Sequence, residues 1–453
     1  MARFRTPPNK EDVLAKVRKL DAIQMLRLAN AAKPTTDQGE YLHWDKFKWR
    51  QGKDVDAELA WFGTKFSRNS ISKDLIKLTA KHDEHFKFCV PDSLWANLHY
   101  IDIKTGGGQK IGDSLFVSSR DKDRYLVSNL MMEEAITSSQ LEGASTTRKV
   151  AKEMLKTRRK PQDKSEQMIV NNFRLMKRAV EIKDEPLTID LIFELHSIAT
   201  FNAIENEAIP GELRKDDSVS VSNQYNEVAH IPPSYKELKD RLSSLCEFAN
   251  ENTAEPESNR FIHPVLKAIM LHFMIGYIHP FGDGNGRTAR ALFYWFMLKR
   301  GYWLFEYVSI SKLIQENRAD YDLAYRYTES DSNDLTYFLY NQTGIIIKAV
   351  NALHQYIEKK RTEFYQFKEW IDKSPVSKRL KNGAIDILKT AVKQPGRTFT
   401  AKLVAQDLDV NENTARTYLN TLVDEGLLMT TNQKGHRGVV YIAPASLREQ
   451  LKI

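Results

Sequence analysis

The sequence contains little cysteine: only Cys89 and Cys246 occur among its 453 residues. Two cysteines are too few for a disulfide framework or for a cluster of metal-binding thiolates. This scarcity argues against the class of small, disulfide-rich secreted proteins. It predicts a protein of a reducing compartment, and we therefore expect a cytoplasmic location.

The sequence also lacks a hydrophobic run long enough to cross a bilayer. Its longest apolar stretch, Val265 to Ile278, falls short of the roughly 20 residues that a transmembrane helix needs and is interrupted by Lys267 and His272. Residues 1–8 carry no apolar segment typical of a signal peptide. We expect no membrane partner and interpret the stretch as a buried core helix.

Strong charge of one sign, internal repeats and low-complexity tracts are missing as well. The net charge is +8, with 28% charged and 42% hydrophobic residues, which is ordinary for a globular protein. The mild basic excess is compatible with a nucleotide or a nucleic acid partner and proves neither. The length predicts two to four domains, at roughly 150 residues per domain.

The most informative segment is residues 279–290, which read His-Pro-Phe-Gly-Asp-Gly-Asn-Gly-Arg-Thr-Ala-Arg. Glycines that open a helix let backbone N–H groups approach an anion, so phosphate is the expected guest. Arg287 and Arg290 share a helix face and are expected to grip successive phosphates. Asp283 suits Mg²⁺ coordinated together with phosphate oxygens, and His279 is placed to take a proton.

This segment resembles the signature of Fic-domain proteins, His-x-Phe-x-Asp/Glu-Gly-Asn-Gly-Arg-x-x-Arg, at every defined position. The resemblance implies transfer of a nucleoside monophosphate, usually AMP from ATP, to a hydroxyl of a target protein. His279 would be the base, and Mg²⁺ on Asp283 would bridge the phosphates. The nucleotide-binding residues would be Gly284, Asn285, Gly286, Arg287, Thr288, Ala289 and Arg290, with Asn285 and the backbone around Gly284 and Gly286 on the α-phosphate and the two arginines on the β and γ phosphates. The alternative is a polar turn between two helices with a glycine cap.

A second motif lies upstream, where Ser138-x-x-x-Glu142-Gly143 resembles the inhibitory helix of many Fic proteins. We expect this helix near residues 124–142. The resemblance implies that Glu142 pairs with Arg290 and thereby denies ATP its γ-phosphate contact. The alternative is a solvated helix face. If Glu142 inhibits the enzyme, its removal is expected to increase modification of the target and of the protein itself.

A β-hairpin is expected between the two motifs. Residues 210–214 are followed by the alternating residues 218–222, a polar turn at residues 223–226, and residues 228–233, with prolines at both ends. In Fic proteins this position is the flap, whose exposed edge can accept a segment of the target protein as an added strand. The alternative is an ordinary surface hairpin.

Residues 309–321 resemble the segment that closes over the adenine in this family. Asn317 and Tyr321 are therefore candidate nucleotide contacts. The family often has two adjacent tyrosines here, whereas this chain has Tyr321 followed by Asp322. Helix capping and core packing are the alternatives for both candidates.

The C-terminal residues 399–428 resemble a helix-turn-helix, and residues 429–442 resemble a winged hairpin with a turn at 433–438. A DNA-binding role would place Asn413, Thr414, Arg416 and Thr417 in the major groove and Lys434 and Arg437 on the wing. Acidic residues nearly balance basic ones in this region, which weakens the case for DNA because phosphate contacts dominate affinity. Formation of a homodimer and docking of a target protein remain alternatives.

We predict a mainly α protein with a Fic helical core, a β-hairpin flap and a small C-terminal winged helix-turn-helix domain. The predicted boundaries are 1–115 for an N-terminal Fic-associated region, 116–350 for the core, 351–380 for a connecting helix and 381–453 for the winged helix. The leading hypothesis is an autoinhibited protein adenylyltransferase. Alternatives are a DNA-binding regulator whose core senses nucleotide, and a Fic enzyme that removes AMP or transfers UMP or phosphocholine. An intact His279 favours catalysis, because a sensor needs no base.

Overall fold

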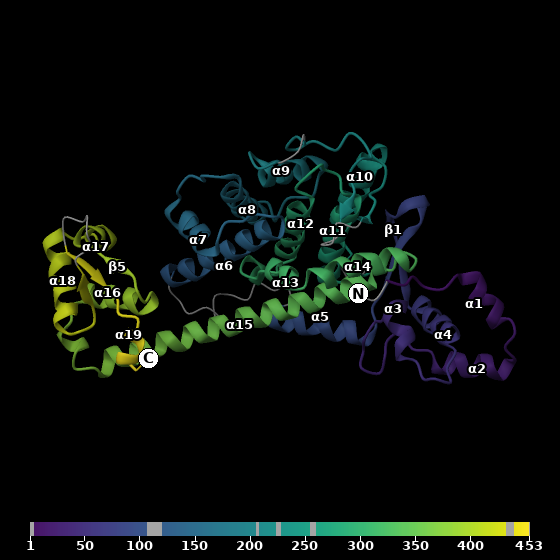
Figure 1. Cartoon of the computed structure of the whole chain (residues 1–453), viewed down its shortest axis with the longest axis horizontal. Helices are drawn as coiled ribbons and strands as arrows, with labels where there is room; N and C mark the ends of the chain where they lie inside the picture. Colours follow the sequence, from purple (N-terminus) through teal and green to yellow (C-terminus); the bar gives the residue numbers. More distant parts are fainter. Residues whose placement is uncertain are drawn as a thin grey trace. The chain divides into compact units, whose positions relative to one another are not determined.

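A computed structural model describes residues 4–106, 120–204, 208–222, 228–253, 260–431 and 439–452. The chain divides into two compact units, Met1–Leu353 and His354–Ile453. Helices dominate both units, and the strands are short and few (Figure 1). The prediction of a mainly α protein is confirmed.

The larger unit consists of helices that surround a central antiparallel pair, together with two small hairpins. Its principal helices are α1 (Lys10–Val17), α2 (Ala22–Ala31), α3 (Trp44–Phe47), α4 (Ala57–Ser70), α5 (Asp92–Thr105), α6 (Arg120–Leu141), α7 (Arg148–Thr157), α8 (Lys164–Glu181), α9 (Ile189–Thr200), α10 (Leu238–Asn250), α11 (Pro264–Ile278), α12 (Asn285–Lys299), α13 (Ser311–Glu316) and α14 (Arg318–Ser330). Strands β1 (Ser72–Thr79) and β2 (His85–Cys89) form one antiparallel hairpin, and β3 (Val221–Ser222) and β4 (Val228–His230) form the other.

The central pair is α11 and α12. Helix α11 is apolar on all sides and is buried along nearly its whole length, as predicted for residues 265–278. Pro264 starts it, and His279 ends it in the left-handed conformation with φ 47°. Helix α12 packs against α8, α9 and α11 (Figure 1), so the loop between α11 and α12 is fixed at both ends by buried helices.

Helix α6 carries the second motif and packs against α8 and α13. It spans Arg120–Leu141, so it starts a few residues before the predicted helix and ends one residue before Glu142. Gly143 follows with φ 100°, a conformation that suits glycine because it has no Cβ.

A helix longer than expected crosses the predicted boundary at residue 350. Helix α15 spans Thr336–Lys373 without a break, whereas we predicted a connecting helix at 351–380. No proline occurs between these bounds, and the single glycine, Gly344, is tolerated inside a helix. The connecting element therefore begins inside the predicted core.

The smaller unit contains α16 (Asn382–Lys393), β5 (Thr398–Phe399), α17 (Ala401–Leu408), α18 (Glu412–Asp424), β6 (Met429–Thr431), β7 (Val440–Ile442) and α19 (Leu447–Gln450). Its three strands pair in the order β5-β7-β6. The Thr400 hydroxyl accepts from the Leu403 N–H at 3.3 Å and caps α17. The winged-helix assignment stays a prediction, and the turn with Lys434 and Arg437 lies outside the described residues.

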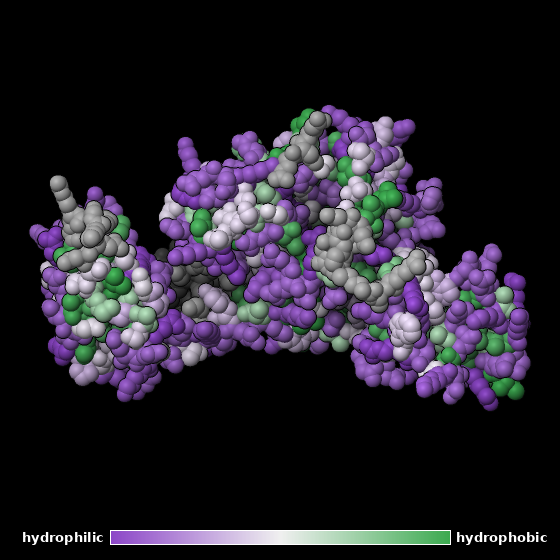
Figure 2. All heavy atoms as spheres, viewed as in Figure 1, coloured by the Kyte–Doolittle hydropathy of each residue, from purple (hydrophilic) through white to green (hydrophobic). Residues whose placement is uncertain are grey.

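In the ranges that the structure describes, no helix combines the length and the apolarity that a membrane crossing requires. The face shown in Figure 2 is mainly hydrophilic, with apolar residues in small separate groups.

Candidate active site

His279 is the first residue of the loop between α11 and α12. Its Nδ1 lies 3.3 Å from the Gly276 carbonyl oxygen. Because a carbonyl only accepts hydrogen bonds, the proton of a neutral ring belongs on Nδ1 and the Nε2 lone pair is left to take a proton. Enclosure of the ring by protein lowers the pKa of His279 to about 4, so the ring is neutral at physiological pH.

The loop after His279 ends in an open helix terminus. Gly284 adopts φ 81°, and a Cβ there would lie 2.5 Å from Thr200 Cγ2, so only glycine fits. No side chain of the described residues caps the first turn of α12, which leaves its N–H groups and the positive end of the helix dipole for an anion. The predicted phosphate cradle would be formed by this terminus, and binding of phosphate there stays a prediction.

Several side chains of the cradle form hydrogen bonds with the main chain of the cradle itself. The Asn285 amide clasps the main chain of Phe281, accepting from its N–H at 3.0 Å and donating to its carbonyl at 2.8 Å. Thr288 donates to the Gly284 carbonyl at 3.0 Å, and Ala289 is buried. The predicted nucleotide contacts of these three residues stay predictions. The backbone N–H groups in the first turn of α12 are left as hydrogen-bond donors for an anion.

The two arginines of the signature point to different neighbours. Arg287 is 1% exposed and donates to the Ala199 carbonyl at 2.7 Å, while its Nη2 lies 3.3 Å from an Asp283 carboxylate oxygen. Its Nε is buried and has no partner among the described residues. Arg287 therefore braces the cradle against α9 and contributes positive charge, and its predicted phosphate contact is untested.

Arg290 faces the inhibitory motif. Its Nε donates to the Ser138 hydroxyl at 2.9 Å, and its Nη2 donates to Glu142 Oε1 at 2.8 Å and to the Ser138 carbonyl at 3.2 Å. Arg290 is 3% exposed, whereas the Glu142 side chain is 27% exposed. The predicted ion pair between residues 148 positions apart is present in the structure.

The Glu142 carboxylate lies against the start of α12. A Cβ added to Gly286 would lie 2.3 Å from Glu142 Oε1, so glycine at this position lets the carboxylate approach the helix terminus. Burial raises the pKa of Glu142, but Arg290, Arg287 and Arg318 outweigh burial and hold it below its ordinary value. Glu142 is therefore ionised and lies where the cradle would hold an anion.

The two candidate base contacts lie on either side of the start of α14. Asn317 is exposed between α13 and α14, and its side chain makes only a long contact with the Leu313 carbonyl at 3.5 Å. The Tyr321 hydroxyl points into the core, 3.0 Å from Nε2 of the buried His272. Their contact with a nucleotide stays a prediction.

Asp283 is the one carboxylate of the signature. Its side chain is 31% exposed and borders a hollow of about 310 Å³, which is also lined by Glu142, Gly143 and Lys164. No group of three or more His, Cys, Asp or Glu residues able to hold a metal occurs among the described residues. A single carboxylate beside a phosphate cradle fits Mg²⁺, which takes one or two carboxylates plus phosphate oxygens.

The structure adds positioning residues that the sequence did not reveal. Glu134 on α6 is 2% exposed and accepts hydrogen bonds from Ser309 and Ser311 at the start of α13. His196 on α9 and Arg214 at the base of the hairpin contact the signature loop. These contacts with Ser309, Ser311 and the signature loop join residues 65 or more positions apart, so local patterns gave no signal for them.

The predicted hairpin is present as β3 and β4, which pair Val221 with His230 and Ser222 with Val228. Its strands are shorter than predicted, and the turn at residues 223–226 lies outside the described residues. His230 Nε2 lies 2.7 Å from the Tyr277 carbonyl near the end of α11. The hairpin is thereby attached to the helix that ends at His279.

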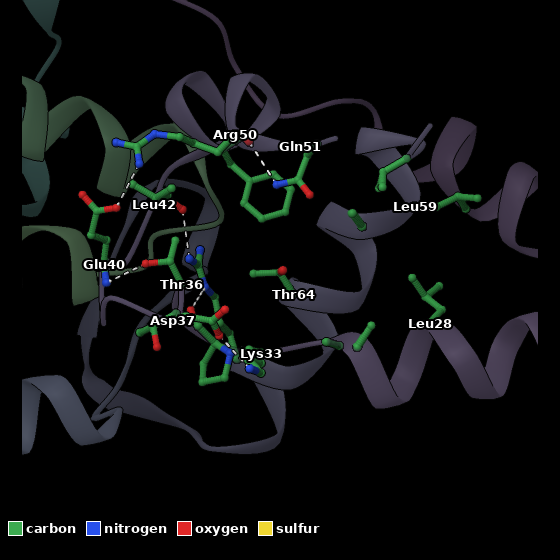
Figure 3. A pocket seen from close by; sticks show the side chains of 18 of the residues that line it. Leu28, Lys33, Thr36, Asp37, Glu40, Leu42, Arg50, Gln51, Leu59 and Thr64 are labelled. Carbon is green, nitrogen blue, oxygen red and sulfur yellow. Dashed lines mark hydrogen bonds and ion pairs between the residues drawn. The ribbon is translucent and has the colours of Figure 1, made fainter. Parts of the chain in front are cut away.

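A second, larger hollow shares no lining residue with this site. It has a volume of about 610 Å³ and lies among α2, residues 33–40, η1 (Lys48–Arg50) and α4 (Figure 3). Figure 3 shows Leu28 and Leu59 on one side of it and the charged Lys33, Asp37, Glu40 and Arg50 around the other. No residue of either motif contributes to this hollow.

Comparisons with known proteins find similarity in the centre of the chain. Residues 186–297 match the Fic/DOC family. A protein adenylyltransferase Fic from Nematostella vectensis is 34% identical over 120 residues, which are 26% of this chain and 25% of that protein. A uridine 5'-monophosphate transferase from Xanthomonas campestris pv. campestris (strain 8004) is 30% identical over 118 residues, 26% of this chain and 22% of that protein.

The matched part thus spans about a quarter of the length of these two relatives. Among solved structures, a Fic family protein from Desulfovibrio desulfuricans G20 gives a TM-score of 0.49 at 17% identity, covering 77% of this chain and 95% of that chain.

Proposed function

We propose that this chain, which contains a Fic domain, is a Mg²⁺-dependent protein adenylyltransferase that Glu142 holds in an inhibited state. The observation that carries the proposal is the position of Glu142, whose carboxylate lies against the anion cradle and binds Arg290 at 2.8 Å. An ionised side chain that covers a cradle of amides and arginines indicates a site for a negatively charged substrate. His279 at the head of the same loop supplies a base for chemistry on that substrate.

The reaction begins with proton removal. His279 Nε2 takes the proton of a Ser, Thr or Tyr hydroxyl of the target protein as the oxygen attacks the α-phosphorus of ATP. The new O–P bond leaves AMP on the target, and the bond to the β-phosphate breaks to release pyrophosphate. The neutral ring, with its proton on Nδ1 beside the Gly276 carbonyl, is ready for this step.

The cradle stabilises the charge of the reacting phosphates. The open N–H groups at the start of α12 bind phosphate oxygens, and Arg290 meets the terminal phosphates once Glu142 has left. Arg287 adds positive charge from its buried position against α9. Asp283 would hold Mg²⁺, which when bound neutralises charge on the phosphates and orients them.

The target protein is proposed to dock on the hairpin formed by β3 and β4. Main-chain groups on an exposed strand edge can pair with an extended segment of another protein, which places a hydroxyl with little demand on sequence. His230 attaches the hairpin to the helix that carries His279, so a docked segment would be positioned relative to the base.

Inhibition follows from competition for Arg290. The arginine already has Ser138 and Glu142 as partners, and the carboxylate excludes phosphate from the same guanidinium. Because the Glu142 side chain is 27% exposed and follows the last residue of α6, it can withdraw without unfolding the core.

The test uses the variant Glu142→Gly with labelled ATP, UTP, CTP and GTP in a cell lysate, followed by mass spectrometry of the labelled proteins. We expect AMP on hydroxyl side chains of target proteins and of the protein itself. Transfer of UMP in place of AMP would overturn the choice of nucleotide, and absence of any transfer would overturn the proposed activity.

A second candidate function belongs to the unit His354–Ile453 alone. Helix α18 exposes Asn413, Arg416 and Thr417, three of the four residues predicted to read DNA, and half-buries the fourth, Thr414. Asn411 caps the start of α18 by accepting from the Thr414 N–H at 2.8 Å. These exposed polar residues favour binding to duplex DNA, whereas exposed Leu403 on the preceding helix suits dimerisation or target docking.

A further inference from the structure

We infer that His196 is a positioning residue that holds the signature loop and the base of the flap hairpin in fixed register. The effect of His196 on catalysis rests on the proposed function, in which docking of the target and binding of phosphate must stay aligned. The contacts of His196 themselves do not depend on that function. One face of helix α9 contacts both the loop and the hairpin base.

The contacting face of α9 contains Phe193, His196, Ser197 and Thr200, whose spacing of i, i+3, i+4 and i+7 puts them on one side of the helix. Two glycines lie directly on this face: Gly211 at the base of the hairpin and Gly284 in the signature loop. Gly211 packs against Ser197, and Gly284 packs against Thr200.

A Cβ on Gly211 would lie 2.4 Å from Ser197 Oγ, and a Cβ on Gly284 would lie 2.5 Å from Thr200 Cγ2. Both glycines have φ 81°. The backbone therefore approaches α9 at two points as closely as glycine allows. Helix α9 is a shared platform for two segments more than 70 residues apart.

His196 joins the two segments through both of its ring nitrogens. The Gly211 N–H donates to Nδ1 at 2.9 Å, so Nδ1 is an acceptor and the ring proton is on Nε2. Nε2–H then donates to the Asp283 carbonyl at 2.8 Å. The ring also stacks on Phe281, with centroids 3.7 Å apart and planes at 3°.

Arg214 makes a second link between the same two segments. Its backbone N–H donates to the Pro280 carbonyl at 2.9 Å, and its Nε donates to the His279 carbonyl at 3.1 Å. The hairpin base is thus attached to the loop at residues 279, 280 and, through His196, 283. A change in the position of the flap is transmitted to the loop that holds the base and the cradle.

The direct test is hydrogen exchange of the unliganded full chain, comparing wild type with His196→Phe, which keeps a stacking ring and loses both hydrogen bonds. We expect exchange to rise by about fivefold or more in the segments 208–214 and 281–286. The Gly211 N–H loses its acceptor, and the loop around Asp283 opens more often because its carbonyl loses the donor that anchors it. His43→Phe is the matched control, since His43 is also a buried, stacked ring whose Nδ1 accepts from a backbone N–H. That control should leave both segments unchanged.

Two further variants separate the two contacts. Asn reproduces the Nδ1 acceptor and Gln reproduces the Nε2 donor, so His196→Asn should loosen mainly 281–286 and His196→Gln mainly 208–214. Equal protection of both segments in wild type and His196→Phe would overturn the inference. So would an increase spread evenly over α9 and its neighbours, since that result indicates a general loss of packing.

Kinetics in the Glu142→Gly background show the consequence for the proposed function. We expect His196→Phe to raise the KM for the target protein and lower kcat, while His43→Phe changes neither at a temperature where both proteins are folded. If Glu142→Gly itself transfers nothing, the proposed function fails, whereas the exchange experiment still decides the role of His196. An unchanged KM and kcat in His196→Phe would contradict the transmission from flap to loop.

Discussion

Two buried arginines show how differently this fold uses the same side chain. Arg68 is 2% exposed and Arg290 is 3% exposed. Arg68 donates to the carbonyls of Pro34 and Leu42 and to the Tyr337 hydroxyl, at 2.8 to 2.9 Å, and lies over the Tyr41 ring. These direct partners are neutral, and the buried carboxylates of Asp331 and Asp334, which accept from the Tyr337 and Tyr41 hydroxyls, raise the pKa of Arg68 from just behind them.

Arg290 depends instead on two residues of the inhibitory motif, Ser138 and Glu142, and one of them carries a charge. Glu142 lies just beyond the end of α6, and in the proposed mechanism a phosphate of the substrate would replace it on Arg290. The comparison teaches that a buried arginine whose partners all belong to the folded core serves the fold, even beside the hollow of Figure 3, which Arg68 lines. A buried arginine whose charged partner is partly exposed is the better candidate for binding a ligand.

The largest expected effect is on the rate of AMP transfer, and it comes from removing the proposed base, His279, beside the Arg290 site. In the Glu142→Gly background, His279→Ala should lower the rate of AMP transfer by about 10²–10⁴-fold, because proton removal is lost while the cradle is intact. Labelled AMP incorporation measures the rate, and binding of ATP should be retained. Transfer within a few-fold of the parent would show that His279 is not the base.

The next effect concerns the fold around the other arginine. Arg68→Ala should lower the free energy of unfolding by about 3–5 kcal/mol, because two carbonyls and the Tyr337 hydroxyl lose a buried donor. Arg290→Ala should cost less, since Glu142 is partly exposed and regains water. Denaturant unfolding of both variants gives the order, and the reverse order would break the comparison.

A smaller effect is expected on the pH dependence of stability. Burial lowers the pKa of His43, which stacks on Tyr327 near Arg68, to about 3 from an ordinary value of 6.5. The unfolded chain takes up the proton first, so this stabilisation is complete above pH 6.5 and is lost as pH falls towards 3. His43→Phe should be less stable than wild type at pH 7.5, and the difference in Tm should shrink at pH 4.5. A constant difference across this range would contradict the assignment of a neutral buried ring.

The smallest effect concerns a third arginine, Arg416, which is exposed on α18 and forms no ion pair within the described ranges. If the unit His354–Ile453 binds DNA, the full chain should bind duplex with an affinity that falls steeply as salt rises. Arg416→Ala should weaken binding and reduce the salt slope by about one unit. Fluorescence anisotropy with a duplex pool measures both, and salt-independent or absent binding would favour docking or dimerisation.

The sequence predicted the parts of the site that are local or carry a complete motif. The loop that begins at His279, the start of the helix that carries Arg290, the helix that ends near Glu142 and the buried helix ahead of the loop were all predicted from local sequence. The contact between Glu142 and Arg290 was predicted only through the resemblance of the two motifs to those of a family, because no local pattern relates residues 148 positions apart.

The parts that escaped prediction depend on tertiary packing. His196 reads in the sequence as one more residue of an amphipathic helix, and its role appears only when Gly211 and Gly284 pack on the same face. The inward amide of Asn285 is a similar case, since a motif fixes the residue but leaves its hydrogen-bond partners open. The uninterrupted α15 shows that the composition of residues 351–380 did not mark a boundary of the helix.

The most direct test of the account is labelled AMP incorporation by wild type and Glu142→Gly, measured side by side with Glu142→Gly/Arg290→Ala and Glu142→Gly/His279→Ala. The account predicts that Glu142→Gly modifies itself and its targets far more than wild type, because Arg290 is free for the terminal phosphates. It predicts that both double variants are inactive again. Equal incorporation by wild type and Glu142→Gly would contradict the claim that Glu142 inhibits the enzyme through Arg290.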